Sequence, residues 1–298
     1  MPSGLRIGFP EAEEARTQEA IRQLLEDAKI RPVAIGLPDA LAALPLGAVE
    51  MCSTADADDP ELGGDPLGWG GVLLARGELD GVVAGAATST AAVLRAGLKR
   101  VGTAAEFETV SSAFYLALRE PTPGRQRILT FTDPAVVPRP TSAQLAEAAA
   151  AACDARRRIV GDQPRVAFLS YSTVGSAGGA EVEKVREALE RFRERCPAIP
   201  AAGELQADAA LVPEIARRKM PGHAIEGDAN ILVFPDLDAA NIAYKLVERL
   251  ASAFALGPIL QGLAAPLNDL SRGAEPRDIV GVAYITALMA SATSANRS

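Results

Sequence analysis

Short apolar segments alternate with longer amphipathic ones at the start of the chain, and this alternation limits the folds that the chain can adopt. Residues 5–9 are mainly apolar, residues 12–29 place apolar side chains at helical spacing, and residues 32–36 are apolar again. Neighbouring parallel strands need a crossover connection, which an amphipathic helix supplies. The pattern therefore predicts an α/β fold with a mostly parallel sheet.

The same rhythm continues through the rest of the chain. Further strands are predicted at residues 81–84, 110–116, 127–131, 165–171 and 230–234, and helices at residues 142–159, 180–195 and 238–254. Three prolines interrupt both periodicities within residues 132–141. Proline fits neither a helix interior nor a central strand, so we expect a domain division near residue 140.

Charge and composition argue against several classes of protein. The net charge is −8 and no basic tract is long enough to follow a phosphate backbone, so nucleic acid is not an expected partner. No apolar run approaches the ~20 residues that span a bilayer, and the N-terminus lacks the order of a signal peptide. We therefore expect no membrane association and a cytoplasmic location.

The residues that commonly bind metals are scattered. Cys52, Cys153 and Cys196 lie far apart in the sequence, and His223 is the only histidine. None of these positions has the spacing of a metal site, so no metal is expected. An odd number of cysteines also fits a reducing compartment better than a disulfide framework.

The most distinctive segment spans residues 266–273 and reads Pro-Leu-Asn-Asp-Leu-Ser-Arg-Gly. The planar guanidinium of Arg272 matches phosphate or carboxylate oxygens two at a time, and the Ser271 hydroxyl can donate or accept a hydrogen bond. Nearby, Asp269 and Asp278 could orient the guanidinium or take a proton. These residue types favour a site for a small anion.

The same segment also allows a purely structural interpretation. Asn268 would cap a short helix that Gly273 ends. Asp269 and Arg272 would then pair at helical spacing. The local pattern leaves both interpretations open.

A second candidate loop follows the predicted strand at residues 165–171. It is rich in Gly and Ser and precedes a predicted helix, and successive backbone N–H groups in that position suit a phosphate. The loop lacks the lysine of a P-loop and the spacing of a dinucleotide-binding motif. Its candidate substrate-binding residues are Ser172, Thr173 and Ser176.

Taken together, the ordered motifs resemble the phosphate acetyltransferase (phosphotransacetylase) family of phosphate acyltransferases. The similarity extends over nearly the whole chain and is strongest from about residue 165 onward. The matching segments are residues 6–11, 80–86, 89–90, 94–95, 165–173, 175–177, 203–210, 230–237, 241–245, 257–262 and 266–273.

This resemblance implies two α/β/α domains with mostly parallel sheets and an active-site cleft between them, as in isocitrate and isopropylmalate dehydrogenases. It also implies that the C-terminal segment returns to the first domain. With the proline-rich division, this gives a first domain over residues 1–140 and about 262–298, and a second over residues 141–261. Members of the family are commonly dimers, so a homodimer is expected.

The resemblance also implies an activity, the reversible transfer of an acetyl group between coenzyme A and inorganic phosphate. Both molecules are substrates, and no bound cofactor is expected. By position in the family motifs, Asp278 is the base that takes the thiol proton, and Ser271 stabilises the charge on the carbonyl oxygen. Arg272 and Arg95 contact the phosphate or acyl phosphate. The remaining substrate-binding candidates from these motifs are Ser89, Thr90, Asn268, Asp269 and Gly273.

The chain departs from the family pattern in several places. Thr88 and Ala96 stand where relatives often have His and Pro, and Ala240 stands where they usually have Gly. Residues 49–73 are also shortened, in a region where some relatives place a helix with an arginine implicated in coenzyme A binding. Two alternatives stay open: a phosphate acyltransferase for propionyl or butyryl groups, and a noncatalytic phosphotransacetylase-like regulatory protein that binds acyl-coenzyme A.

Overall fold

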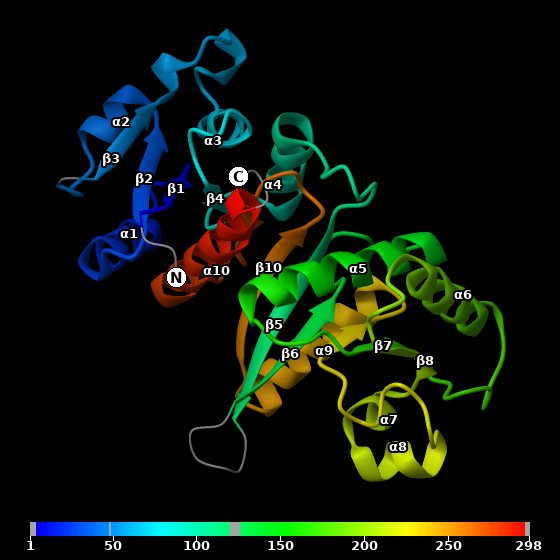
Figure 1. Cartoon of the computed structure of the whole chain (residues 1–298). Coiled ribbons are helices and arrows are strands. Elements are labelled where there is room, and N and C mark those ends of the chain that lie inside the picture. The colour runs from blue at the N-terminus through cyan, green and yellow to red at the C-terminus, as the bar shows by residue number, and fades with distance from the viewer. Residues whose placement is uncertain (1–3, 48, 120–125, 296–298) are drawn as a thin grey trace. The chain divides into compact units, whose positions relative to one another are not determined.

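The computed structural model describes residues 4–47, 49–119 and 126–295, and the chain divides into two compact units (Figure 1). Unit 1 comprises Met1–Glu106 and Gly257–Ser298, and unit 2 comprises Phe107–Leu256. The first division falls at residue 106, before the proline-rich segment near residue 140 where we expected it. The reason is that β5 (Ser111–Arg119) and β6 (Gln126–Thr132) belong to the sheet of unit 2.

Unit 1 contains a five-stranded sheet in the order β11-β4-β1-β2-β3, in which every neighbouring pair is parallel. This agrees with the predicted parallel sheet. The strands are β1 (Arg6–Phe9), β2 (Arg31–Gly36), β3 (Glu50–Ser53), β4 (Gly81–Ala84) and β11 (Leu267–Asp269).

The helices of unit 1 cover both faces of this sheet. α1 (Ala15–Asp27) leads from β1 to β2, and α3 (Pro66–Ala75) leads from β3 to β4 in the opposite direction across the sheet. Right-handed crossovers running in opposite directions lie on opposite faces. α1 packs against α10 (Pro276–Ala295), and α3 packs against α4 (Thr90–Ala96) and the π-helix η3 (Gly97–Val101). The short helices are α2 (Pro38–Ala42), η1 (Thr54–Asp56) and η2 (Pro60–Leu62).

The second sheet has six strands in the order β10-β5-β6-β9-β7-β8; all but β10 lie within unit 2, and β10 begins in unit 2 and continues past Leu256 into unit 1. β5 and β6 form an antiparallel hairpin, whereas the pairs from β6 to β8 are parallel. The predicted helix at residues 238–254 ends at Leu250, because β10 begins at Phe254. The remaining elements are α5 (Ser142–Ile159), β7 (Val166–Leu169), α6 (Ala180–Arg195), β8 (Ala201–Leu205), α7 (Ala207–Leu211), α8 (Pro213–Lys219), β9 (Ile231–Val233), α9 (Leu237–Leu250) and β10 (Phe254–Gln261).

Alternating side chains of the central strands build two hydrophobic clusters in unit 2. On β9, Ile231 and Val233 join a cluster with residues of α5 and α6, whereas Leu232 joins a cluster with residues of α7, α8 and α9. β7 alternates in the same way, with Val166 in the first cluster and Ala167 in the second. Successive side chains of a strand point to opposite faces, so the sheet is the middle of three layers.

A buried guanidinium ties the middle of the unit 2 sheet to α5. Arg156 is 1% exposed and makes a bidentate pair with Asp162, with Nε to Oδ1 at 2.7 Å and Nη2 to Oδ2 at 2.6 Å. It also donates to the hydroxyl of Thr130 and to the carbonyls of Asn230 and Ile128, all within 3.0 Å. Strands β6 and β9 are therefore held at the same buried point.

We expect Arg156→Met to lower the free energy of unfolding of unit 2 by about 3 kcal/mol or more, because it leaves the carboxylate, hydroxyl and carbonyl groups without a donor. The matched control is Arg157→Met on the same helix, whose side chain is 45% exposed and lies 3.7 Å from Asp154. Calorimetry of thermal unfolding measures both variants. Equal losses of stability would refute the assigned role of Arg156.

Candidate functional site

Three neighbouring strands of unit 1 end at one edge of the sheet. β4 lies between β1 and β11, all three are parallel, and Asp269 of β11 is the register partner of Ala84. The segments that follow these strands therefore leave the sheet side by side. Ligands of open α/β sheets bind beyond this edge, where the strands have their carboxyl ends.

The Glu11 carboxylate fills a cradle of backbone amides in the segment after β4. Its Oε2 accepts hydrogen bonds from the N–H groups of Gly85 and Ala86 at 2.8 and 2.7 Å. Its Oε1 accepts from Ala87 and Thr88 at 3.1 and 2.6 Å. Four successive N–H groups directed at one carboxylate form an anion-binding nest. Glu11 thus fixes the backbone that leads into α4.

Gly85 lets this segment approach β11 closely. Its φ is +106°, and a Cβ there would lie 2.3 Å from Oδ1 of Asp269 and 2.7 Å from the backbone nitrogen of Leu270. Both the backbone conformation and the lack of space favour glycine. The approach brings the loop after β4 against the strand that leads into residues 271–273.

Asp269 is completely buried and joins β11 to the first turn of α4. Its Oδ2 accepts a hydrogen bond from the Thr90 hydroxyl at 2.6 Å, while its Oδ1 is buried without a hydrogen-bond partner among the residues described. Burial raises the pKa of Asp269 to about 7, since the Thr90 hydroxyl and the Leu270 amide only partly offset the loss of solvation. The negative charge of Glu11 adds to the rise.

Asn268 is also inaccessible to a substrate. Its side-chain oxygen accepts from the backbone N–H of Leu260 at 2.9 Å, and its side-chain nitrogen donates to the Thr286 hydroxyl at 2.9 Å. Asn268 and Thr286 are both fully buried. These bonds link β10, β11 and α10. The geometry therefore gives Asn268 and Asp269 supporting positions in place of the direct substrate contacts we expected.

Ser271, Arg272 and Gly273, in contrast, are exposed in the turn between β11 and α10. Asp278 lies in the first turn of α10, where its Oδ2 accepts from the backbone N–H of Glu275 at 2.9 Å. Its Oδ1 lies 3.6 Å from Nε of Arg277. The purely structural interpretation of the motif is wrong: Asn268 and Asp269 lie in β11, no helix spans residues 268–273, and Asp269 bonds to Thr90 and not to Arg272. The exposed polar turn at residues 271–273 agrees with the anion-site interpretation.

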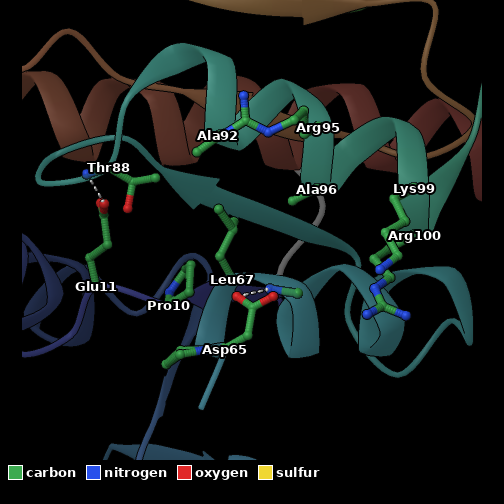
Figure 2. A pocket seen from close by; sticks show the side chains of 12 residues that line it. Pro10, Glu11, Asp65, Leu67, Thr88, Ala92, Arg95, Ala96, Lys99 and Arg100 are labelled. Atoms are coloured by element: carbon green, nitrogen blue, oxygen red, sulfur yellow. Dashed lines mark hydrogen bonds between the residues drawn. The ribbon is translucent and has the colours of Figure 1, made fainter. Parts of the chain in front are cut away.

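A cavity of about 440 Å³ opens beside the Glu11 nest (Figure 2). Its walls come from the segment after β1, the start of α3, and the continuous helical stretch of α4 and η3. Three cations line it: Arg95, Lys99 and Arg100. Two carboxylates line it as well, but Glu11 is bound in the nest and Asp65 caps α3 by accepting from Gly68 N–H at 2.8 Å. The wall formed by α4 and η3 is therefore electropositive.

The cations around this edge differ in how far they are already paired. Lys99 lies 3.7 Å from Glu61, and Arg100 lies 3.6 Å from Asp59. The side chains of Arg95 and Arg272 make no hydrogen bond or ion pair with any part of the chain that the structure describes. Two guanidiniums of unit 1 are thus available to an anion.

The candidate loop of unit 2 has a different character. Ser172 is fully buried and donates to Oε1 of Glu204 at 2.7 Å, and Thr173 is 6% exposed, with its hydroxyl accepting from Gln206 N–H at 3.0 Å. Only Ser176 of the three predicted hydroxyls is exposed, and its oxygen accepts from the Thr173 N–H at 2.9 Å. Ser172 and Thr173 therefore shape the loop from inside.

Glu204 is the anchor of this loop. Its carboxylate accepts from Ser172 and the Gly175 N–H, and the Arg186 guanidinium donates to both carboxylate oxygens at 2.9 and 3.0 Å. Burial alone would raise the pKa of Glu204, but the hydrogen bonds from Arg186, Gly175 and Ser172 outweigh it and lower the pKa to about 2. The carboxylate stays charged at any physiological pH.

Sequence reasoning gave no role to Glu11 or Glu204. Glu11 follows the end of β1 by two residues, and Glu204 is next to last in β8, where side chains reach the loops of neighbouring strands. Both also fall in matching segments, residues 6–11 and 203–210, and these two signals could have identified them. Within the described part of the chain there is no cluster of His, Cys, Asp or Glu able to hold a metal ion. In the same part, no helix is long and apolar enough to cross a membrane.

Asp269→Asn should reduce the pH dependence of stability. The pKa of Asp269 in the folded protein, about 7, lies above its usual value of 3.8, so the folded state holds this proton more tightly than the unfolded chain. Stability contributed by the group is thus present at low pH and is lost as the pH rises from about 4 to about 7. The loss amounts to at most about 4 kcal/mol at 1.36 kcal/mol per pKa unit.

Denaturant unfolding at a series of pH values measures this effect, with Asp238→Asn on the exposed start of α9 as the control. Between pH 4 and 7 the Asp269→Asn curve should fall less steeply than those of the wild type and the control. Parallel curves for all three proteins would show that Asp269 does not retain its proton.

Comparison with known proteins gives the chain a family. The family model described as phosphate acetyl/butaryl transferase matches residues 53–287. A phosphate acetyltransferase of Acetivibrio thermocellus is 48% identical over 226 residues, which cover 76% of this chain and 68% of that protein. One from Paracoccus denitrificans is 38% identical and covers 95% of this chain and 94% of that protein.

The fold comparison agrees. The crystal structure of a phosphotransacetylase from Streptococcus pyogenes superposes with a TM-score of 0.88 at 34% identity, covering 97% of this chain and 94% of that one. The similarity predicted from the sequence motifs is confirmed by these matches. The chain belongs to the phosphate acetyl/butaryl transferase family.

Proposed function

We propose that this protein transfers an acetyl group reversibly between coenzyme A and inorganic phosphate. The observation that carries the proposal is the exposed pair Ser271 and Arg272 at the carboxyl edge of the unit 1 sheet, with Asp278 in the helix that follows. The family membership supports it, since several relatives named phosphate acetyltransferase are similar over most of the chain. Coenzyme A and phosphate are the substrates, and no bound cofactor is invoked.

The proposed reaction begins with the thiol of coenzyme A. A thiol with a pKa of about 8.5 is only a few per cent thiolate at neutral pH, so a base accelerates its attack. Asp278 has one oxygen in the helix cap, and the other, Oδ1, which lies 3.6 Å from Nε of Arg277, would take the thiol proton. The sulfur then bonds to the carbonyl carbon of acetyl phosphate, the bond from that carbon to the bridging oxygen breaks, and phosphate leaves.

The negative charge that develops on the carbonyl and phosphate oxygens in this step is stabilised by hydrogen-bond donors. The Ser271 hydroxyl would donate to the carbonyl oxygen as it becomes negative. The unpaired guanidiniums of Arg272 and Arg95 would hold the phosphate oxygens in pairs, which a lysine could not reproduce. In the reverse direction the same groups bind inorganic phosphate.

The cavity beside α4 is the proposed place for the anionic part of coenzyme A. Residues 49–73 supply η2 and most of α3, and the start of α3 lines the cavity. Arg76 is an unsuitable ligand, because its guanidinium pairs with Asp58 at 3.0 Å and lies over the Trp69 ring. Lys99 and Arg100 are better placed, since both line the cavity and their acidic partners lie at 3.6 Å or more.

A homodimer and a cytoplasmic location complete the proposal. In unit 2, α9 exposes Ile242, Leu246 and Leu250 by 59%, 53% and 82%. Residues four apart lie on one helical face, so these side chains form an apolar stripe of the kind that a second subunit covers.

A phosphate-dependent assay of thiol release from acetyl-coenzyme A tests the activity. Asp278→Asn should lower kcat by roughly 10²–10⁴-fold because the base is lost, and Ser271→Ala by about 10²-fold or more because a donor to the oxyanion is lost. Matched controls are Asp238→Asn at the start of α9 and Ser53→Ala, which removes the serine that caps η1. No phosphate-dependent release by the wild type with acetyl, propionyl or butyryl substrates would disprove the proposed function.

Leu246→Glu should shift the protein from dimer to monomer, because it puts a charge in the middle of the apolar stripe. Light scattering after size-exclusion chromatography measures the mass. Leu25→Glu on α1, where the leucine is 37% exposed outside the stripe, is the control. An unchanged dimer mass for Leu246→Glu would exclude this face as the interface.

A further inference from the structure

Arg16, in the first turn of α1, joins two loops that are distant in the sequence. Its Nη1 donates to the carbonyls of Arg272 and Ala274 at 3.0 and 2.9 Å, and its Nη2 donates to the carbonyl of Ala86 at 2.9 Å. One guanidinium thus holds the turn after β11 and the loop after β4. Neither loop is close to Arg16 along the chain, at separations of 256, 258 and 70 residues.

The orientation of this guanidinium is fixed by its own neighbour. Glu14, the N-cap of α1, accepts from Nε of Arg16 at 2.8 Å and from the Arg16 backbone N–H at 2.7 Å. With Nε bound to Glu14, the planar group directs its two terminal nitrogens at the carbonyls. A lysine would offer a single nitrogen on a flexible stem and could not hold all of these positions.

The turn that Arg16 holds has little other support. In the described part of the chain, the other hydrogen bonds of residues 271–274 are local: Ala274 N–H to the Ser271 carbonyl at 2.8 Å, and Gly273 N–H to the Ser271 hydroxyl at 3.4 Å. Ser271, Arg272 and Gly273 are exposed, so packing does little to fix them, whereas Ala274 is buried. Its long-range hydrogen bonds come from Arg16.

The other loop is held from the same segment of chain. The N–H of Ala86 donates to Glu11, and its carbonyl accepts from Arg16. Two side chains of opposite charge therefore bind the two backbone polar groups of one residue. Three residues later Ser89 caps α4, the helix that carries Arg95. Arg16 therefore fixes the position of the Arg272 backbone relative to the loop that leads into α4 and Arg95.

We propose that Arg16 is a positioning residue for acyl transfer, an inference that rests on the proposed function. It holds the Arg272–Ala274 backbone against the Ala86 loop, so that the Ser271 hydroxyl and the Arg272 guanidinium meet the substrate in a fixed geometry. Arg16 itself touches no reacting atom. Its loss acts through the residues of the turn.

The experiment compares Arg16→Ala and Arg16→Lys with Arg22→Ala. Arg22 lies on the same helix, is 42% exposed on its side chain, and pairs with Glu19 at 2.7 Å. Arg16→Ala should lower kcat by about 10²-fold, the scale of a 1 Å misplacement, with smaller changes in KM. Arg16→Lys should recover little of this loss, and Arg22→Ala should match the wild type.

Two further measurements separate positioning from loss of folding. Millimolar methylguanidinium should restore part of the kcat of Arg16→Ala, whereas ammonium at the same ionic strength should not. Hydrogen exchange should show faster exchange at Gly273 and Ala274 in Arg16→Ala than in Arg22→Ala, with the rest of unit 1 unchanged. This readout does not depend on activity.

The outcomes distinguish this inference from the proposed function. A wild type without phosphate-dependent thiol release disproves the function, whatever the Arg16 variants do. An active wild type with an equally active Arg16→Ala disproves the positioning role. Unchanged exchange at residues 273–274, or a loss of kcat that follows general unfolding and is not rescued by methylguanidinium, also disproves it.

Discussion

The parallel pairing of β11 with β4 is the constraint on which the rest of the site depends. β4 ends at Ala84, whereas β11 belongs to the part of unit 1 that follows unit 2 in the chain. Their pairing lets Thr90 reach the Asp269 carboxylate, 179 residues away. Without it, the exposed turn at residues 271–273 would have no fixed relation to the Glu11 nest, the cavity or Arg95.

Two buried carboxylates show how the number of donors sets the charge of such a site. Glu204 is 2% exposed and Asp269 is fully buried, so both lose nearly all contact with water. Arg186, Ser172 and the Gly175 amide hold the pKa of Glu204 at about 2, whereas Asp269 has the Thr90 hydroxyl and a pKa raised to about 7. Burial raises the pKa of both carboxylates, and only in Glu204 do the hydrogen bonds outweigh it.

The sequence was sufficient to predict the α/β class and most of the strands, because buried parallel strands are short apolar runs separated by helices. It did not distinguish the β5–β6 hairpin from parallel strands, since apolar runs carry no information about strand direction. The division between the units was placed too late because it was inferred from the prolines of residues 132–141, which follow β5 and β6 and lie within unit 2.

The sequence predicted the residue types of the candidate site better than it predicted which of them are exposed. The exposed positions of Ser271 and Arg272 agree with an anion site. The burial of Asn268, Asp269 and Ser172 could not be predicted from their polarity, because a polar side chain can be buried when the fold supplies hydrogen-bond partners. Those partners, such as Leu260 N–H and Thr286 for Asn268, are set by tertiary structure. The roles of Glu11 and Arg16 were hidden for the same reason.

The split of unit 1 along the chain has a consequence for synthesis on the ribosome. Unit 2 is one continuous stretch and can close as soon as it has been made, whereas the first unit must wait for β11 and α10. Until then one edge of β4 has unpaired backbone groups, the kind of edge that promotes association between nascent chains. The turn that Arg16 holds is translated after unit 2, so the region assigned to catalysis assembles only after unit 2 has been made.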